Sequence, residues 1–315
     1  MGVRPVRRMV TIAVVGLLAL ATLVATAWVL TPGTWNWRAS GFTGQSAPET
    51  HTLPIAAGST LTLRVHNAAE ITVVDGPAGQ ATATTRLRWV GWGQAAAHVV
   101  WSVTTSPSGP QVSASVSPAI WWTPTLAVDL ALPTDASLVL SEDNGAVSLS
   151  GSHPQVSIHA TNGSVDATGY HGLLQVEGEN GRIQVTDATI PGDLRLGTVN
   201  GQIIVARAQV DGALQAVTTN GDLNLTAIRL GGAFDLQTTN GRVSYTGGGG
   251  QGGQAASVNG EVAVRLDPPA QAGHYKVFTP QGQQAWPEPS GPELGSIQLT
   301  SVRGSVHFSG GGSGS

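Results

Sequence analysis

Apolar and polar residues alternate along most of the chain after residue 31, and this alternation recurs in units of about twenty residues. Each unit contains an Asn-Gly pair, and the seven pairs are separated by 18, 18, 20, 20, 20 and 19 residues. A period of two predicts β-strands, and self-similarity at a fixed interval predicts a stacked repeat fold. The seven asparagines, which we expect to form a stacked ladder of turn residues, are Asn144, Asn162, Asn180, Asn200, Asn220, Asn240 and Asn259.

Aligned on the glycine of each pair, the units share their apolar positions, which predicts two short strands per unit with one face inward. The position two residues after the glycine is held by Val147, Val165, Ile183, Ile203, Leu223, Val243 and Val262. The position six residues before the asparagine is held by Leu138, Val156, Leu174, Leu194, Leu214 and Phe234, with Gly253 as the exception. A second glycine is expected to mark the opposite bend, at Gly172, Gly192, Gly212 and Gly232.

Two architectures satisfy this pattern locally. Asn-Gly between alternating strands is typical of a β-hairpin, so a meander or a sandwich of hairpins is one of them. The other is a parallel β-solenoid, which also explains why successive units share every column. We therefore predict an all-β chain with a right-handed parallel β-solenoid of about nine rungs over residues 136–308. Each asparagine should have a left-handed backbone, and Thr198, Thr218 and Thr238 should form a short hydroxyl ladder beside them.

The chain before the repeats departs from this period. Residues 59–76 look like a degenerate opening rung, and residues 80–130 look like longer antiparallel strands. Together, residues 50–135 are predicted to form an N-terminal β cap that covers the open strands at that end. Residues 309–315 are rich in Gly and Ser and predict a flexible tail.

The N-terminal segment predicts a membrane protein. Residues 10–30 carry no charge and are long enough for one transmembrane helix. Arginines in residues 1–9 place that end in the cytoplasm, and residues 31–49 form a linker on the outside. The alternative is a signal peptide cleaved near Ala27. Both interpretations export the remaining chain, so we expect it at the cell surface.

Composition and net charge limit the classes of partner and cofactor that the chain is expected to bind. The net charge of the chain is −4, and without the three N-terminal arginines the remainder carries −7, so no basic face for nucleic acid is expected. The sequence has no cysteine, which excludes disulfides and a cysteine-ligated metal. We predict no cofactor.

At "LAVDLALPTDASLVLSEDNGAVSLSG" (126–151), a strand ending in proline leads into Asn-Gly-x-Val units. With the "TNG" units that follow, residues 50–308 resemble the bacterial "putative adhesin" β-solenoid family, a domain of unknown function. The resemblance implies an exported, often membrane-anchored envelope protein, and it supplies no catalytic residues. The segment 89–122 agrees least with the family.

Candidate chemistry is sparse. The pair Glu142 and Asp143 is a candidate for acid–base catalysis, but solvated turn charges are the simpler interpretation. His153, His159 and His171 could approach one another across rungs, a weak basis for a metal site. Candidate ligand contacts are aromatic and lie outside the repeat, although a core role would suit them too: Trp89, Trp92, Trp101, Trp121 and Trp122.

The prediction for function is therefore a non-catalytic, adhesin-like binding or scaffold protein, with the membrane and surface glycans or envelope proteins as partners. The alternatives are an envelope-stress or signalling accessory that acts through partner proteins, and a polysaccharide-active enzyme. The enzyme would require a groove with clustered acids on adjacent rungs.

Overall fold

A computed structural model describes residues 43–66, 68–90, 98–116, 125–267, 275–278 and 295–309. Within these ranges the chain forms strands and no helix, which confirms the prediction of an all-β chain. No helix in this part of the chain is long and apolar enough to span a membrane. The predicted transmembrane helix at 10–30 and the tail from residue 310 lie outside the described residues.

The strands divide into an N-terminal group and a repeat group. The N-terminal strands are β1 (Thr43–Gln45), β2 (Glu49–Pro54), β3 (Thr60–Val65), β4 (Ala68–Gly76), β5 (Gln80–Val90), β6 (Val99–Ser106), β7 (Gly109–Val116) and β8 (Thr125–Pro133). The repeat strands are β9 (Ser137–Asn144), β10 (Ala146–Asn162), β11 (Val165–Asn180), β12 (Ile183–Thr186), β13 (Thr189–Ile190), β14 (Leu194–Asn200), β15 (Ile203–Ala206), β16 (Gln209–Val210), β17 (Leu214–Asn220), β18 (Leu223–Leu230), β19 (Phe234–Asn240), β20 (Val243–Gly247), β21 (Gly252–Ser257), β22 (Val262–Leu266), β23 (Tyr275–Phe278), β24 (Gly295–Ser301) and β25 (Val306–Ser309).

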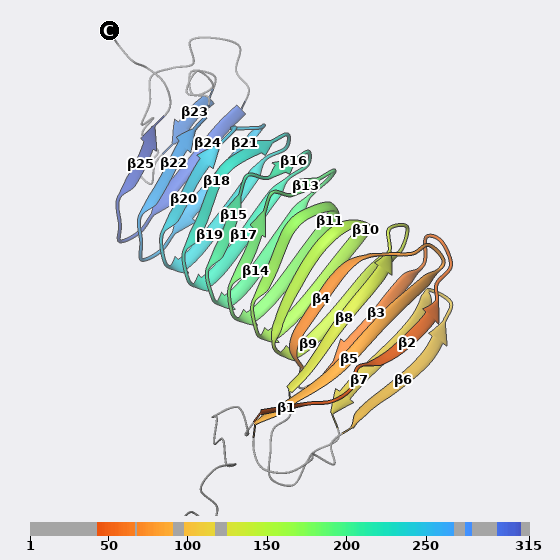
Figure 1. The fold of residues 1–315 in the computed structure, drawn as a ribbon. Coiled ribbons are helices and arrows are strands. Elements are labelled where there is room, and N and C mark those ends of the chain that lie inside the picture. Colours follow the sequence, from red (N-terminus) through yellow and green to blue (C-terminus); the bar gives the residue numbers. More distant parts are fainter. Residues whose placement is uncertain are drawn as a thin grey trace, which may run out of the picture. The chain divides into compact units, whose positions relative to one another are not determined.

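From β9 to β20, each repeat strand pairs in parallel with the strand one unit later, at the same column of the repeat (Figure 1). At the C-terminal end the next rung comes from further along the chain: β21 pairs with β24 and β22 with β25, and β23 lies on the other side of β24. Ile183, for example, pairs with Val165 on one side and with Ile203 on the other. The strands that flank an Asn-Gly pair are therefore not antiparallel partners, and the hairpin alternative is wrong. Ladder hydrogen bonds run between units, so each unit depends on its neighbours for its backbone pairing.

The core runs through the centre of this stack. The inward residues of the two predicted columns are at most 2% exposed, and the outward residues between them are half-buried or exposed. Fully burying one such aliphatic side chain stabilises the fold by roughly 1.5–3 kcal/mol. Because the side chain of one rung packs on its copies, the apolar columns hold the stack together along its length.

The first two strands of the stack do not lie at its end. Leu63 on β3 pairs with Val112 of β7 on one side and with Leu140 of β9 on the other. In the same way β4 lies between β8 and β10. The strands β3 and β4 therefore lie inside the stack, and the chain continues from them to an outer layer before it returns to β9, as Figure 1 shows for β3, β4, β7 and β8.

This arrangement corrects the expectation for residues 80–130. As predicted, β5 pairs antiparallel with β2 and β8, and β6 pairs antiparallel with β7. However, β7 and β8 also pair in parallel with β3 and β4, so they form a further layer of the stack. Local alternation shows that a segment is a strand, whereas the direction of its neighbour depends on a partner far away in sequence.

The bends also differ from expectation. None of the ladder asparagines has positive φ, so the predicted left-handed turn is wrong. Among the described non-glycine residues, positive φ occurs at Asp187, Arg207 and Ala227, at 54°, 52° and 54°. These three follow β12, β15 and the first half of β18 at intervals of 20 residues. They add a third bend, so units such as β12–β13–β14 contain three strands where two were predicted.

Candidate functional site

The asparagines form a continuous ladder on the surface. Each side-chain amide Nδ2 donates to the Oδ1 of the asparagine one rung earlier, at 2.7–3.1 Å, from Asn259 back to Asn144. Net contributions of about 0.5–1.5 kcal/mol per hydrogen bond are typical, and chains of such bonds polarise one another. Since every Oδ1 from Asn144 to Asn240 already accepts a ladder bond, the ladder acts primarily on the register of the stack.

The hydroxyls beside this ladder do not bond to one another, which corrects the predicted hydroxyl ladder. Thr218 and Thr238 donate to the backbone carbonyls of Gly201 and Gly221, at 3.0 and 2.9 Å. The hydroxyl of Thr198 is buried without a partner. These side chains face inward, where the nearest acceptor is a glycine carbonyl of the preceding rung.

Glu142 occupies the same inward column at the start of the repeat. It pairs with Val65 and Ala160, is 1% exposed, and neither carboxylate oxygen has a hydrogen-bond partner. Burial raises the pKa of Glu142 to about 7, helped by the charge of Asp143; the nearby backbone N–H of Asn144, which does not reach hydrogen-bond geometry, opposes this only weakly. Asp143 points outward and contacts His66 at 2.6 Å. The structure therefore separates the two acids that the sequence presented as a pair.

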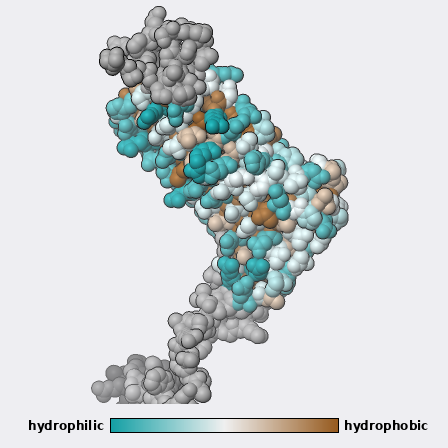
Figure 2. Space-filling view, turned by 45° about the horizontal axis from the view of Figure 1, so that its top comes forward, coloured by the Kyte–Doolittle hydropathy of each residue, from teal (hydrophilic) through white to brown (hydrophobic). Residues whose placement is uncertain are grey.

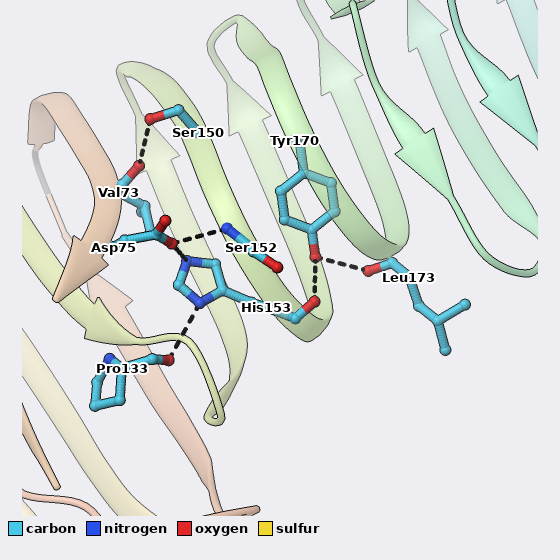
Figure 3. Close-up of polar contacts among 8 residues, drawn as sticks. All are labelled: Val73, Asp75, Pro133, Ser150, Ser152, His153, Tyr170 and Leu173. Atoms are coloured by element: carbon cyan, nitrogen blue, oxygen red, sulfur yellow. Dashed lines mark hydrogen bonds and ion pairs between the residues drawn. The ribbon is translucent and has the colours of Figure 1, made fainter. Parts of the chain in front are cut away.

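A second buried polar cluster joins β4, β8 and β10 (Figure 3). His153 Nδ1 donates to the carbonyl of Pro133 at 3.2 Å, which leaves Nε2 facing the Asp75 carboxylate at 3.6 Å. Asp75 also accepts the backbone N–H of Ser152 at 2.7 Å. The buried hydroxyl of Tyr170 lies on the other side, and its one proton is shared between the carbonyls of His153 and Leu173, at 3.2 and 3.1 Å.

Burial controls the protonation of this cluster. Desolvation lowers the pKa of His153 below 6.5, against the opposing effects of the Pro133 carbonyl and the charge of Asp75. Desolvation also raises the pKa of Tyr170. The folded state therefore favours neutral imidazole, and this contribution to stability is lost as the pH falls through the lowered pKa of His153.

The cluster resembles a catalytic His–Asp pair only in composition. The His153 side chain is 0% exposed, so a substrate has no access to the imidazole. His159 contacts Glu177 at 3.8 Å, and His171 is an exposed residue that pairs with Ser152. The three histidines thus point in different directions. Within the described ranges, no three His, Asp or Glu side chains are grouped closely enough to hold a metal ion.

We predict that Tyr170→Phe destabilises the fold by about 1–3 kcal/mol, because it leaves two buried carbonyls without their donor. Urea unfolding of the variant and the parent protein measures the difference. Tyr245→Phe is a useful comparison, since the Tyr245 ring is equally buried and its hydroxyl donates to a backbone carbonyl, that of Gly248. Equal stability of Tyr170→Phe and the parent would contradict the structural role of the cluster.

The five candidate tryptophans are only partly described. Trp92, Trp121 and Trp122 lie outside the described residues, and Trp89 lies on β5. Trp101, on β6, packs against the core and stacks on His51 with ring centroids 4.5 Å apart and an interplanar angle of 6°. Trp101 is therefore engaged within the fold, which matches the alternative of a core role for this residue.

An open groove of about 810 Å³ crosses the repeat at the third bend, a site that the sequence did not reveal. Its floor is apolar and includes Ala208 and Ile228. At one end Arg207 forms a two-point ion pair with Asp187, at 2.6 and 2.8 Å. Hydrogen bonding to Arg207 lowers the pKa of Asp187, and the same contact raises the pKa of Arg207. In the sequence, the available signal for this bend was the 20-residue spacing of the dissimilar residues Asp187, Arg207 and Ala227, which share no common turn residue such as Gly or Asn.

The chain was compared with known proteins. No protein-family model matches the sequence, and no curated protein matches it. The structure is similar to a "putative adhesin" from Bacteroides fragilis, at 11% identity and a TM-score of 0.44, covering 83% of this chain and 97% of that one. A "putative adhesin" from Parabacteroides merdae is 11% identical with a TM-score of 0.48, covering 83% and 95%. A "putative cell adhesion protein" from Clostridium sporogenes is 9% identical with a TM-score of 0.22, covering 83% and 99%. These names match the family that the sequence resembles, and similarity at this level defines no activity.

Proposed function

We propose that this chain is a non-catalytic, adhesin-like binding or scaffold protein of the cell surface, held at the membrane by residues 10–30. In this proposal the repeat is a right-handed parallel β-solenoid. The parallel pairing of the repeat strands from β9 to β20 with their copies one unit later supports that architecture. The predicted anchor and its orientation rest on the sequence of the N-terminal segment.

The observation that carries the binding role is the open groove at the third bend. Its charged side chains are accessible, and Asp187, whose pKa is lowered by its hydrogen bond to Arg207, is engaged in an ion pair. His153 and Tyr170, which could exchange protons, are sealed in the core. Figure 2 shows polar and apolar residues interspersed over the face that it presents. Such a surface favours holding a ligand over transforming it.

Binding to isolated envelope fractions tests the role. Full-length protein reconstituted in vesicles should retain wall polysaccharide, and prolonged incubation should leave the polymer at its original length. Shortening of the polymer would contradict the non-catalytic role. Retention of an envelope protein with no polysaccharide would instead favour an accessory that acts through partner proteins.

Protease treatment of intact cells tests the location. With one tag at each terminus, external protease should remove the C-terminal tag and leave the N-terminal tag protected. Protection of both tags would contradict export of the repeat. Loss of the N-terminal tag from the mature protein would show cleavage near Ala27.

A further inference from the structure

The groove is hollow because the residue at the third bend becomes smaller from one rung to the next. The column shrinks from Arg207 to Ala227, and the next rung has no equivalent residue, because the register shifts between Thr226 and Ile228 where β18 meets β20. Gly247 and Gly248 line the groove on that next rung. The lining spans five rungs from Asp187 to Asp267, on the order of 20 Å at about 4.8 Å per rung. The hollow is therefore elongated along the stack.

Among the described residues, the groove lining leaves one cation and one acid without an ion-pair partner: Arg229 near its middle and the exposed Asp267 at its far end. Arg207 is committed to Asp187. Arg229 projects outward from β18, and its guanidinium has no ion-pair or hydrogen-bond partner in the part of the chain that the structure describes. A guanidinium presents paired donors that match a carboxylate, so Arg229 is available to a carboxylate from outside.

The backbone of the groove offers little to a peptide. Its N–H groups are already bonded along the stack: that of Arg207 donates to Thr226, that of Arg229 to Ala208, and that of Gly248 to Ile228. An extended peptide that adds to a sheet needs unpaired backbone groups, which these positions do not offer. Here recognition must come from side chains, and Thr189 and Gln209 add polar groups beside Arg229.

We infer that this groove binds an acidic saccharide chain, with a sugar carboxylate paired to Arg229 and the chain lying along the hollow made by Ala227 and Gly247. The inference rests on the proposed binding role and gives it a ligand class. A hydroxyl-rich polymer suits an elongated, open site whose polar groups are side chains. The Arg229 contact is solvent-exposed, so binding should weaken as the salt concentration rises.

Titration of the full-length protein with a short polyuronate tests the inference. Arg229→Gln should weaken binding roughly tenfold, the loss expected for a charged hydrogen-bonded contact. Ala227→Asn should also weaken it by filling the hollow. Asparagine tolerates the positive φ of 54° at this position, so this variant keeps the bend. Arg182→Gln is the matched control, because Arg182 is exposed after a different bend and outside the groove lining; it should bind as the parent does.

Three results would overturn the inference: unchanged polyuronate affinity in Arg229→Gln, equal affinity for an uncharged glycan of the same length, or tighter binding of poly-glutamate than of polyuronate. The last result would assign the groove to an acidic peptide. Failure here is distinguishable from failure of the proposed function. If both groove variants still retain envelope polysaccharide as the parent does, the binding role stands and the groove is not its site.

Discussion

Replacing Glu142 with glutamine is expected to stabilise the protein by about 3 kcal/mol at pH 8 and to leave its stability nearly unchanged near pH 4.5. The carboxyl is 1% exposed and its pKa in the fold is about 7, against an ordinary value of 4.5. Each pH unit of such a shift corresponds to about 1.4 kcal/mol between the two protonation states.

The direction in which stability changes with pH follows from the protons that the folded and unfolded states bind. Between pH 4.5 and about 7 the folded state holds a proton on Glu142 that the unfolded state has released, so stability falls as the pH rises through this window. Above it, the fold carries a buried carboxylate with no hydrogen-bond partner. Glutamine is uncharged at every pH and removes this cost.

Urea unfolding of parent and variant at pH 4.5 and pH 8 measures the effect as a difference between the two proteins. His153 and the surface carboxylates are common to both and cancel. Glu177→Gln is the control, since that side chain is 61% exposed and its replacement should change stability by no more than about 0.5 kcal/mol at either pH. An equal effect of Glu142→Gln at the two pH values would contradict burial of a protonated acid.

The second large effect is expected at the glycine of an Asn-Gly pair. In Gly201→Ala the new Cβ would lie 1.8 Å from the carbonyl oxygen of Gly181 and 2.7 Å from its carbon. Both atoms belong to the backbone of the adjacent rung, so the clash can be relieved only by separating rungs. We expect the free energy of unfolding to fall by about 3 kcal/mol or more.

The strand β14, which ends immediately before Gly201, offers a matched control four residues earlier. A Cβ added at Gly197 meets nothing within 4 Å. Gly197→Ala should therefore be neutral or stabilising by about 0.5 kcal/mol, because alanine has less backbone freedom to lose. Urea unfolding compares the two variants under one condition. If both cost the same, the rungs do not approach as closely at the asparagine corner as the structure has them.

Gly201 and Glu142 show which features of the structure the sequence could predict. Asn200-Gly201 and its copies were predicted as a stacked corner, and the asparagines do stack. A left-handed turn is the reason that the sequence suggests for the Asn-Gly pair. The structure gives a different reason: Gly201 is required because a neighbouring backbone leaves no room for a Cβ. A preference for glycine in sequence does not distinguish positive φ from close approach.

The burial of Glu142 could have been predicted from the sequence. It stands two residues before Asn144, in the column that Thr198, Thr218 and Thr238 occupy in later units, and inward positions alternate up to that column. The interpretation of Glu142 as a solvated turn charge follows from the usual link between charge and exposure, and here that link misleads. Column position was the better guide, since every residue in a column shares the direction of its side chain.

The sequence by itself determined the all-β class, the inward faces of the two apolar columns, the length of the unit and the asparagine stack, because these follow from period-two alternation and from a repeat that brings like residues together. The tertiary structure alone decided three features: the insertion of β3 and β4 between β7–β8 and β9–β10, the third bend at Asp187, Arg207 and Ala227, and the groove that this bend creates. These depend on which distant strand supplies the next rung and on backbone angles at dissimilar residues. Neither leaves a local signature in the chain.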